Sequence, residues 1–204
     1  MKEYLELVDY VLKNGVRKEN RTGVATISTF AYSYKVDLNK GYPLLSTKKV
    51  FFNSMLHELF WYLSGEEHIK NLRDKTKIWD AWADEEGLLE TAYGRFWRRY
   101  PVPETGLDGE VFIKEDSKWA KREENGQLVF DQIQYIIDTL KEMKTDPNHR
   151  KGRRLIVLAW NPGNAAVSKL PPCHYTFAFN VLGNKLNCHL TQRSGDIALG
   201  IPFN

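Results

Sequence analysis

The chain has 204 residues, of which 42% are hydrophobic and 27% charged, and its formal net charge is +3. These values suit one soluble domain. The longest apolar run, LIVLAW, is far too short to cross a membrane, and the charge alone does not indicate nucleic-acid binding. Two cysteines do not make a disulfide framework and no Cys/His spacing suggests zinc, so we expect a cytoplasmic protein without a bound metal.

The first fifteen residues, MKEYLELVDYVLKNG, combine helical periodicity with charges throughout, so we expect a helix rather than a signal peptide. Asn14–Gly15 ends this helix. Its apolar face is expected to comprise Tyr4, Leu5, Val8, Val11 and Leu12. Residues 19–38 then indicate a turn followed by β segments.

The strongest helical pattern lies in residues 47–65, where Gly65 stops the helix. Its apolar stripe is predicted to be Phe52, Met55, Leu56, Leu59, Phe60 and Leu63. Another helix is predicted over residues 130–143, with Phe130, Ile133, Ile137 and Leu140 inward. The polar, charge-dense residues 101–130 are predicted to form a surface insertion, with a small hairpin around Asn125–Gly126.

Residues 153–160 predict a buried strand, and residues 174–182 and 185–194 predict two more, joined by Gly183–Asn184. Gly-Asn between alternating runs favours a two-residue hairpin turn, which fixes the register of the two strands. Cys188 then faces Phe179, far along the ladder from Cys173, so a disulfide between the cysteines is implausible.

The same register has a consequence for Cys173. It places Ser194 opposite Cys173 and Arg193 opposite His174, so the Arg193–Ser194 pair lies beside the thiol. A one-residue bulge would shift this pairing.

Cys173 stands at the start of a strand, directly after Pro171–Pro172. One interpretation is a small buried hydrophobe, the commonest role of a free cysteine and the one we expect for Cys188. However, the two prolines make a stiff lead-in without amide donors, and a neighbouring guanidinium would favour the nucleophilic thiolate. Both interpretations stay open. His174 points to the opposite strand face from Cys173, so a structural or water-ordering role is at least as well supported as that of a base.

Arginines stand at several predicted element ends: Arg21 in the polar turn ENRTG, Arg153–Arg154 before a strand, and Arg193–Ser194 at the end of another. Most basic side chains are simply solvated. Arginine beside Ser, Thr and Gly at an element end nevertheless suits an oxyanion, because a guanidinium binds phosphate in a bidentate manner. The run HRKGRR could also contact RNA, although one short basic run is weak evidence.

Glu58 borders the apolar stripe of the helix in residues 47–65. It is either a surface residue or a carboxylate at a pocket edge, where burial can tune it into a proton-transfer group. Trp79 and Trp82 lie three residues apart and could stack a planar ring or, as favoured by the sequence alone, simply pack.

These segments together carry a family resemblance. ENRTG, GYPLLSTKK, HELFWYLSG, IWDAWAD, AYGRFWR, RRLIVLAWN, LPPCH and QRSGDIALGIPFN occur in the order and at about the spacing of the folate-dependent, cysteine-nucleophile thymidylate synthases. The chain strongly resembles that family over nearly its whole length. Three positions depart from the family pattern: Phe96 replaces a glutamine, and Gly195 and Ala198 replace larger residues.

The resemblance implies a reaction. A methyltransferase of this family converts dUMP to dTMP with 5,10-methylenetetrahydrofolate as co-substrate, and releases dihydrofolate. Cys173 would add to C6 of uracil, which makes C5 nucleophilic, following the logic of covalent catalysis. Glu58, Tyr93 and His174 would organise water and proton transfers, and Asp196 would contact the pterin and help to order the site.

The resemblance also implies the binding residues. Arg21, Arg193 and Ser194 would hold the nucleotide phosphate with Gln192 beside them, and Asn204 would read the uracil edge. Lys48, Trp79, Trp82 and Asp196 would lie on the folate side. Arg153 and Arg154 would reach the phosphate of a neighbouring subunit, which implies a homodimer. No membrane or nucleic-acid partner is expected.

The implied fold is α/β (α+β), with a large mixed β-sheet flanked by helices in a sheet-to-sheet homodimer; periodicity itself gives an α+β order. We expect one domain over residues 1–204 that lacks the C-terminal part of the family, and little or no turnover from this chain alone. Two alternatives remain open: a deoxyuridylate hydroxymethyltransferase, and a non-catalytic nucleotide- or RNA-binding protein on the same fold. An intact Cys173 with its arginines argues against the second alternative.

Overall fold

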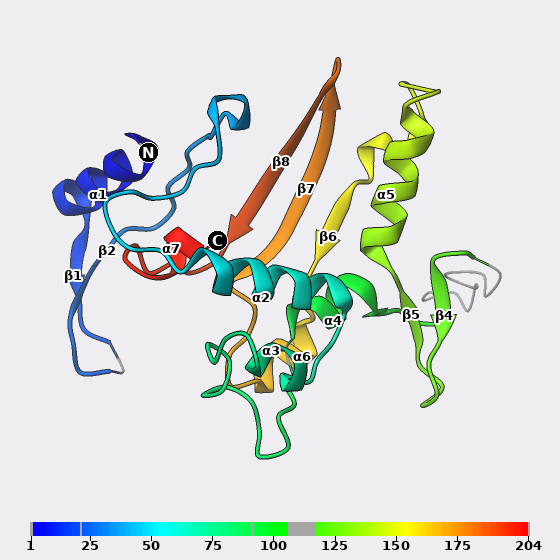
Figure 1. The fold of residues 1–204 in the computed structure, drawn as a ribbon, viewed down its shortest axis with the longest axis horizontal. Helices are drawn as coiled ribbons and strands as arrows, with labels where there is room; N and C mark the ends of the chain where they lie inside the picture. Colours follow the sequence, from blue (N-terminus) through cyan, green and yellow to red (C-terminus); the bar gives the residue numbers. More distant parts are fainter. Residues whose placement is uncertain (1, 21, 91, 106–116, 204) are drawn as a thin grey trace. The chain divides into compact units, whose positions relative to one another are not determined.

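The computed structural model describes residues 2–20, 22–90, 92–105 and 117–203 (Figure 1). Contacts divide the chain into two compact units, Met1–Phe51 with Asp196–Asn204, and Phe52–Gly195. Both contain helices and antiparallel strands or turns, so the predicted mixture of helices and strands is confirmed. The sheets are small and antiparallel, and a large mixed sheet stays a prediction.

The smaller unit begins with a helix, as predicted. Its elements are α1 (Lys2–Asn14), β1 (Val16–Lys18), β2 (Thr26–Ser28), the 3-10 helix η1 (Leu38–Lys40) and α7 (Gly200–Phe203). Leu7 and Val11 are the buried residues of α1, whereas Leu5 and Leu12 are exposed. The predicted apolar face of this helix was therefore partly wrong, because the apolar stripe is broad and only one edge of it is covered.

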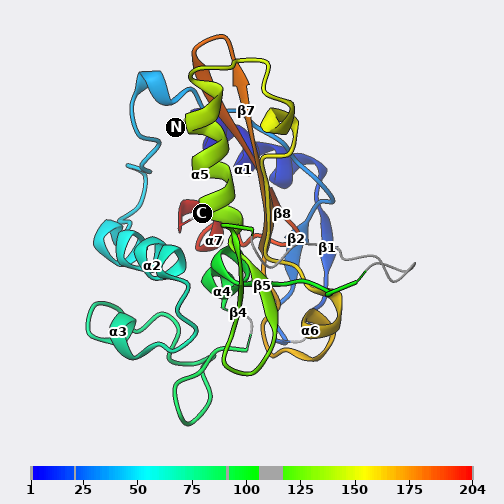
Figure 2. The same cartoon turned by 90° about the vertical axis from the view of Figure 1, so that its right-hand side faces the viewer.

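The larger unit holds the remaining elements. Its helices are α2 (Phe52–Ser64), α3 (Lys70–Arg73), α4 (Tyr93–Arg98), α5 (Gln132–Met143), the 3-10 helix η2 (Arg150–Arg153) and α6 (Pro162–Val167). Its strands are β3 (Tyr100–Pro101), β4 (Ala120–Arg122), β5 (Leu128–Phe130), β6 (Ile156–Leu158), β7 (His174–Leu182) and β8 (Lys185–Gln192). They form two antiparallel sheets, in the orders β3-β5-β4 and β6-β7-β8. The helix α5 runs beside β6 in both ribbon views (Figures 1 and 2).

Helix α2 ends before Gly65 as predicted, but it buries a different face. Trp61 and Tyr62 are buried, whereas Phe60, from the predicted stripe, is 56% exposed. The two buried rings lie beside or among the polar residues of the helix, such as His57 and Glu58, so the contact with α4 overrides the apolar stripe. Tyr62 packs on α4 where Gly94 has no side chain, and a Cβ on Gly94 would lie 2.3 Å from the Tyr62 carbonyl oxygen. The close approach of α4 therefore decides which face is covered.

Helix α5 begins two residues later than predicted, because Asp131 caps it and accepts a hydrogen bond from the Gln134 amide. Its buried residues are Gln132, Ile136 and Thr139, and the expected Ile137 is exposed. The Gln132 side chain lies along β6: its Nε2 donates to the Phe96 and Leu158 carbonyls at 2.7 and 2.8 Å, and its Oε1 accepts from the Leu158 amide at 2.9 Å. It thus satisfies backbone groups at the free edge of this strand.

The predicted hairpin around Asn125–Gly126 is confirmed, because β4 and β5 pair across it. Leu128 and Val129 of β5 are buried. That residues 101–130 form a surface insertion stays a prediction, and residues 106–116 of it lie outside the described residues.

The β7–β8 hairpin turns at Gly183, whose φ of +60° lies in the left-handed region. Leu182 faces Lys185 and Phe179 faces Cys188, as predicted. A β-bulge between His174 and Thr176 then shifts the pairing by one residue, so His174 faces Gln192.

The expected pairing near the thiol was therefore wrong in detail. Arg193, not Ser194, lies opposite Cys173, and its amide donates to the Cys173 carbonyl at 2.8 Å. The bulge brings the arginine one position closer to Cys173 than an uninterrupted ladder would.

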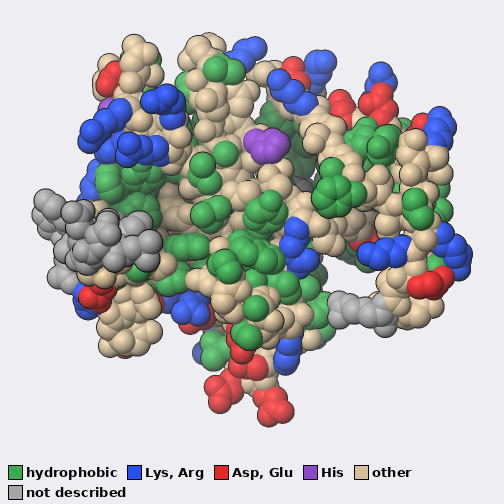
Figure 3. Space-filling view, turned by 180° about the vertical axis from the view of Figure 1, so that it is seen from behind, with side chains coloured by type: hydrophobic (Ala, Val, Ile, Leu, Met, Phe, Trp, Pro, Cys, Tyr) green, Lys and Arg blue, Asp and Glu red, His purple; other side chains and the backbone are tan. Residues whose placement is uncertain are grey.

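The strand β6 is buried on one face rather than throughout. Val157 is 0% exposed, whereas Ile156 is 49% exposed. Cys188 on the outer strand β8 is also exposed, contrary to the expected buried position, because this side of the strand has no cover in the described residues. Hydrophobic side chains accordingly reach the surface in several patches (Figure 3).

Candidate active site

Cys173 lies half-buried at the start of β7, directly behind the two prolines. The Arg193 guanidinium is held beside it: Nε donates to the Pro172 carbonyl at 2.9 Å and Nη2 to the Pro171 carbonyl at 2.8 Å. Nη2 also lies 3.9 Å from the Cys173 Sγ, and the guanidinium carbon lies 5.7 Å from the centre of the Trp160 ring. The guanidinium is thus fixed with one of its nitrogens facing the sulfur of a potential nucleophile.

Tyr93 on α4 is joined to Cys173 through the backbone. Its hydroxyl accepts a hydrogen bond from the Cys173 amide at 2.6 Å. Burial, together with the negative charges that Cys173 and Glu58 can carry, raises the pKa of Tyr93 although the amide of Cys173 lowers it. The phenol therefore keeps its proton and can donate it to a further acceptor.

His174 points into the core, away from the thiol, as the strand alternation predicted. Its side chain is buried, and its ring stacks on Tyr93 with centroids 4.0 Å apart and planes 11° apart. Burial lowers the pKa of His174 to about 4, so the imidazole is neutral at pH 7. Its buried Nδ1 has no hydrogen-bond partner among the described residues.

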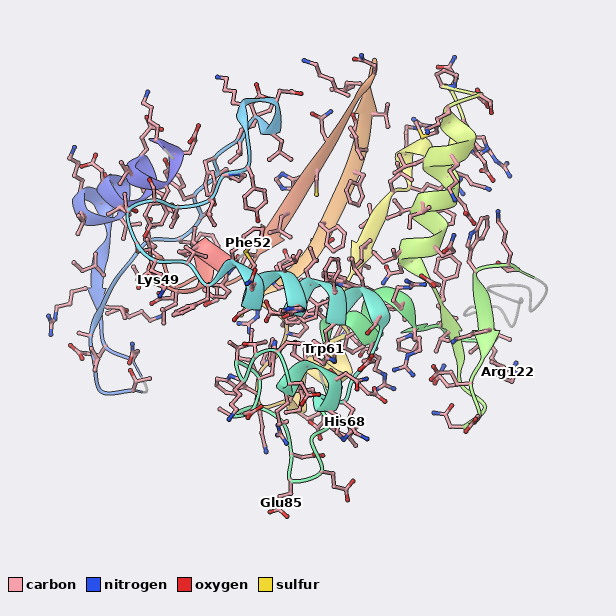
Figure 4. All side chains as sticks on the ribbon, in the orientation of Figure 1. Lys49, Phe52, Trp61, His68, Glu85 and Arg122 are labelled. Atoms are coloured by element: carbon pink, nitrogen blue, oxygen red, sulfur yellow. The ribbon has the colours of Figure 1, made fainter. Side chains whose placement is uncertain are left out.

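Glu58 shares a face of α2 with Trp61 and Tyr62, three and four residues further on (Figure 4 labels Trp61). The Trp79 indole donates to its Oε1 at 2.7 Å. Burial raises the pKa of Glu58, and hydrogen bonds from Tyr62 and Trp79 partly offset this. A carboxyl group with a raised pKa can exchange protons near neutral pH.

Aromatic rings connect Glu58 to the cysteine. The centroid of Trp79 lies 6.1 Å from that of Tyr93, and the centroid of Tyr62 lies 5.0 Å from that of Tyr93. Trp82 is partly buried against the same cluster. Glu58, Tyr93, His174, Trp79 and Cys173 are thus brought together within one unit.

The other candidates of this unit are more exposed. Gln192 donates to the Ser194 carbonyl at 2.7 Å, and Ser194 is exposed. Arg153 and Arg154 are exposed, and within the described residues the structure gives their side chains no ion pair or hydrogen bond. No contact in the described residues joins either arginine to Cys173.

Two candidates lie in the smaller unit. Lys48 donates to the Ala198 carbonyl. Asp196 accepts a hydrogen bond from the Leu199 amide at 2.6 Å through its side chain, just before α7. Arg21 and Asn204 lie outside the described residues.

The sequence interpretation missed two residues of the cluster. Trp160 provides the ring beneath Arg193, and Tyr62 hydrogen-bonds Glu58. The helical spacing of four between Glu58 and Tyr62 could have indicated the second contact. Trp160 carries no such signal, because its contact depends on strands distant in the sequence.

Neither a metal centre nor a membrane span is found in the described part of the chain. No group of three or more His, Cys, Asp or Glu residues there could hold a metal ion. None of the described helices is long and apolar enough to cross a membrane.

Comparison with known proteins identifies the family. The family model described as thymidylate synthase matches residues 2–204. The thymidylate synthase of Haloferax volcanii is 60% identical over 202 residues, which cover 98% of this chain and 56% of that protein. The chain thus spans about half the length of this relative. Because the family match runs along nearly all of its residues, as the motifs predicted, this chain belongs to the thymidylate synthase family.

Proposed function

We propose that this chain carries the nucleophilic centre of a thymidylate synthase, a methyltransferase that converts dUMP to dTMP with 5,10-methylenetetrahydrofolate and releases dihydrofolate. The observation that carries the proposal is the Arg193 guanidinium beside the half-buried Cys173 thiol, with Tyr93 and Glu58 behind it. The family match and the name of the Haloferax relative support the same activity. We place this chemistry in the cytoplasm.

In this reaction the Cys173 thiolate forms a bond to C6 of uracil, and the C5=C6 electron pair moves onto the C4 carbonyl oxygen. C5 then bonds to the one-carbon unit and loses its proton to a base, and the bond between that carbon and the folate nitrogen breaks, which leaves on C5 a methylene group that the hydride reduces to methyl. The folate supplies both that carbon unit and a hydride, and leaves as dihydrofolate. The C5=C6 bond re-forms as the Cys173 sulfur departs, which regenerates the thiolate.

The neighbouring groups handle the protons. Glu58, with its raised pKa, exchanges a proton with water or with the uracil carbonyl region. Tyr93 keeps its proton and donates a hydrogen bond toward the water that takes the C5 proton. His174, neutral and buried, orders that water through a ring nitrogen.

The phosphate and uracil contacts follow the family pattern. Arg193, Arg21 and Ser194 hold the phosphate, with Gln192 beside them, and Asn204 reads the uracil edge. A guanidinium already ordered by carbonyl oxygens binds phosphate with less loss of side-chain entropy. On the folate side we assign Trp79, Trp82, Lys48 and Asp196.

The same proposal makes the protein a homodimer. Arg153 and Arg154 are exposed and available to the phosphate bound by a second subunit. The apolar side chains of Ile156 and Leu158, which lie on one face of β6, are also exposed, as expected of a surface that a second sheet covers.

Trapping with 5-fluoro-dUMP together with 5,10-methylenetetrahydrofolate tests the proposal. Fluorine at C5 cannot leave as a proton, so a working site stalls as a covalent complex on Cys173. Intact mass spectrometry should show a gain of nucleotide plus folate that disappears in Cys173→Ala and persists in Cys188→Ala, the exposed cysteine that serves as the control.

The alternatives predict other outcomes. Hydroxymethyl-dUMP as the product of turnover with dUMP would favour the hydroxymethyltransferase. Binding of dUMP with no adduct and no protection of Cys173 from alkylation would overturn the synthase assignment in favour of a nucleotide-binding protein.

A further inference from the structure

Glu142, near the end of α5, is the meeting point of three basic side chains. Its carboxylate lies 3.3 Å from the Lys151 Nζ, 3.5 Å from the His149 Nε2 and 3.9 Å from the Lys118 Nζ. Lys151 and His149 belong to the segment 149–154, whereas Lys118 precedes β4. The carboxylate therefore ties this segment to α5.

Trp119 provides a second hold on Lys151. The Lys151 Nζ lies 4.7 Å from the centre of the Trp119 ring, and the Lys118 Nζ lies 4.8 Å from it. The indole is itself fixed, because it donates to Asp138 on α5 at 3.0 Å. Lys151 is thus held by a carboxylate and an aromatic ring together.

The anchored residues pass directly into the exposed arginine pair. Gly152 is buried so closely against Met143 that a Cβ would lie 2.8 Å from the Met143 Cε. The Arg154 amide donates to the Lys151 carbonyl at 2.8 Å, which joins the pair to the anchored lysine. The packing of the 3-10 helix η2 against α5 therefore determines where Arg153 and Arg154 lie and in which direction they point.

Charge makes this arrangement costly without Glu142. Arg150, Lys151, Arg153 and Arg154 crowd four cations into five consecutive residues. Like charges at this spacing repel, and within the described residues Glu142 is the carboxylate that pairs with Lys151 in this run. Its side chain is only 36% exposed, so solvent screens the attraction less than at a fully exposed ion pair.

We propose that Glu142 is a positioning residue, which fixes the segment 149–154 so that Arg153 and Arg154 are presented to the phosphate of dUMP in the neighbouring subunit. This inference rests on the proposed function. Glu142 touches no substrate in it and acts only through the arginine pair.

The test compares Glu142→Gln with Asp138→Asn, which removes a carboxylate one turn earlier on α5 that pairs with Lys118 and touches no residue of the segment 149–154 directly, and which keeps an amide oxygen to accept from the Trp119 indole. In Glu142→Gln we expect hydrogen exchange at the Gly152 and Arg154 amides to accelerate, and the Kd for dUMP to rise, each by about three- to tenfold. Asp138→Asn should change neither. In an Arg153→Ala/Arg154→Ala background, Glu142→Gln should weaken dUMP binding no further.

The outcomes separate the two proposals. If the parent protein binds dUMP and Glu142→Gln leaves both exchange and Kd unchanged, the positioning role is overturned. Equal weakening with and without the arginine pair also overturns it, because Glu142 would then act by another route. A parent protein that binds no dUMP overturns the proposed function, and the inference with it, even where exchange shows that Glu142 anchors the segment.

Discussion

The hydroxyl of Tyr93 accepts a hydrogen bond from the backbone amide of Cys173 at 2.6 Å. Removing this hydroxyl in Tyr93→Phe should leave the ring stacking on His174 intact but free the amide of Cys173, just before β7. We expect the formation of the Cys173 adduct with 5-fluoro-dUMP to slow by roughly tenfold or more. Time-resolved mass spectrometry measures this rate. An unchanged rate would mean that the hydroxyl neither orders the thiol nor takes part in proton transfer.

Arg193 should control the reactivity of one cysteine and not the other. Its guanidinium lies beside the Cys173 sulfur, whereas Cys188 lies fifteen positions further along the chain on β8. In Arg193→Gln, alkylation of Cys173 by iodoacetamide at pH 7 should slow by about tenfold. Peptide mapping after labelling measures both cysteines in the same molecule. An equal change at Cys188 would point to a general loss of structure instead.

His174 should make the protein less stable in acid. The pKa of its buried imidazole is lowered to about 4, from 6.5 in the unfolded chain. Between these values the unfolded state binds a proton that the folded state does not, so stability falls as pH falls through this window. The loss approaches about 3 kcal/mol at the lower end.

His174→Phe keeps a ring to stack on Tyr93 and removes the titration. The free energy of unfolding, measured with urea at several pH values from 7 to 4, should therefore depend less on pH in this variant than in the parent. His189→Gln, at an exposed position on β8, is the control and should follow the parent. The same pH dependence of the unfolding free energy in His174→Phe and in the parent would contradict the assignment of a buried neutral imidazole.

Replacing the polar Gln132 by an apolar residue should reduce the free energy of unfolding. Gln132→Leu leaves the Phe96 carbonyl and both backbone groups of Leu158 without their partner. We expect a loss of roughly 2–4 kcal/mol in unfolding free energy. Gln134→Leu, two residues on in α5, loses a single side-chain contact with Asp138 and should cost less than about 1 kcal/mol. A similar cost at both positions would refute the edge-capping role.

Much of the larger unit could be predicted from local signals. Gly183–Asn184 fixed the hairpin register as far as Thr176, and Gly65 marked the end of α2. These predictions succeed because turn geometry depends on two or three consecutive residues. The buried face of α2 could not be predicted in this way, because it depends on the close approach of Gly94 in α4 to Tyr62, which the apolar stripe of α2 does not encode.

The residues of the candidate site could be predicted from the sequence, but the contacts that hold them in place could not. Cys173, Glu58 and Tyr93 were expected from the motifs, and the structure brings them together. The ring of Trp160 beneath Arg193 and the hold of Glu142 on Lys151 arise between segments distant in the sequence. No periodicity within either segment encodes such contacts.

The bulge at the start of β7 gives the hairpin one residue more on one strand than on the other. Tyr175 is that residue, and its carbonyl bonds to Ala159 on the side of β6. If Tyr175 paired with Gln192 instead, the ladder would be uninterrupted, and it would bring a neutral hydroxyl, that of Ser194, to the place opposite the sulfur. Every functional side chain would still be present in such a repaired hairpin, yet the positive charge would sit one rung away from the thiol. The bulge thus determines which residue of the second strand faces the thiol. A design procedure that rewards ideal strand pairing would remove it first.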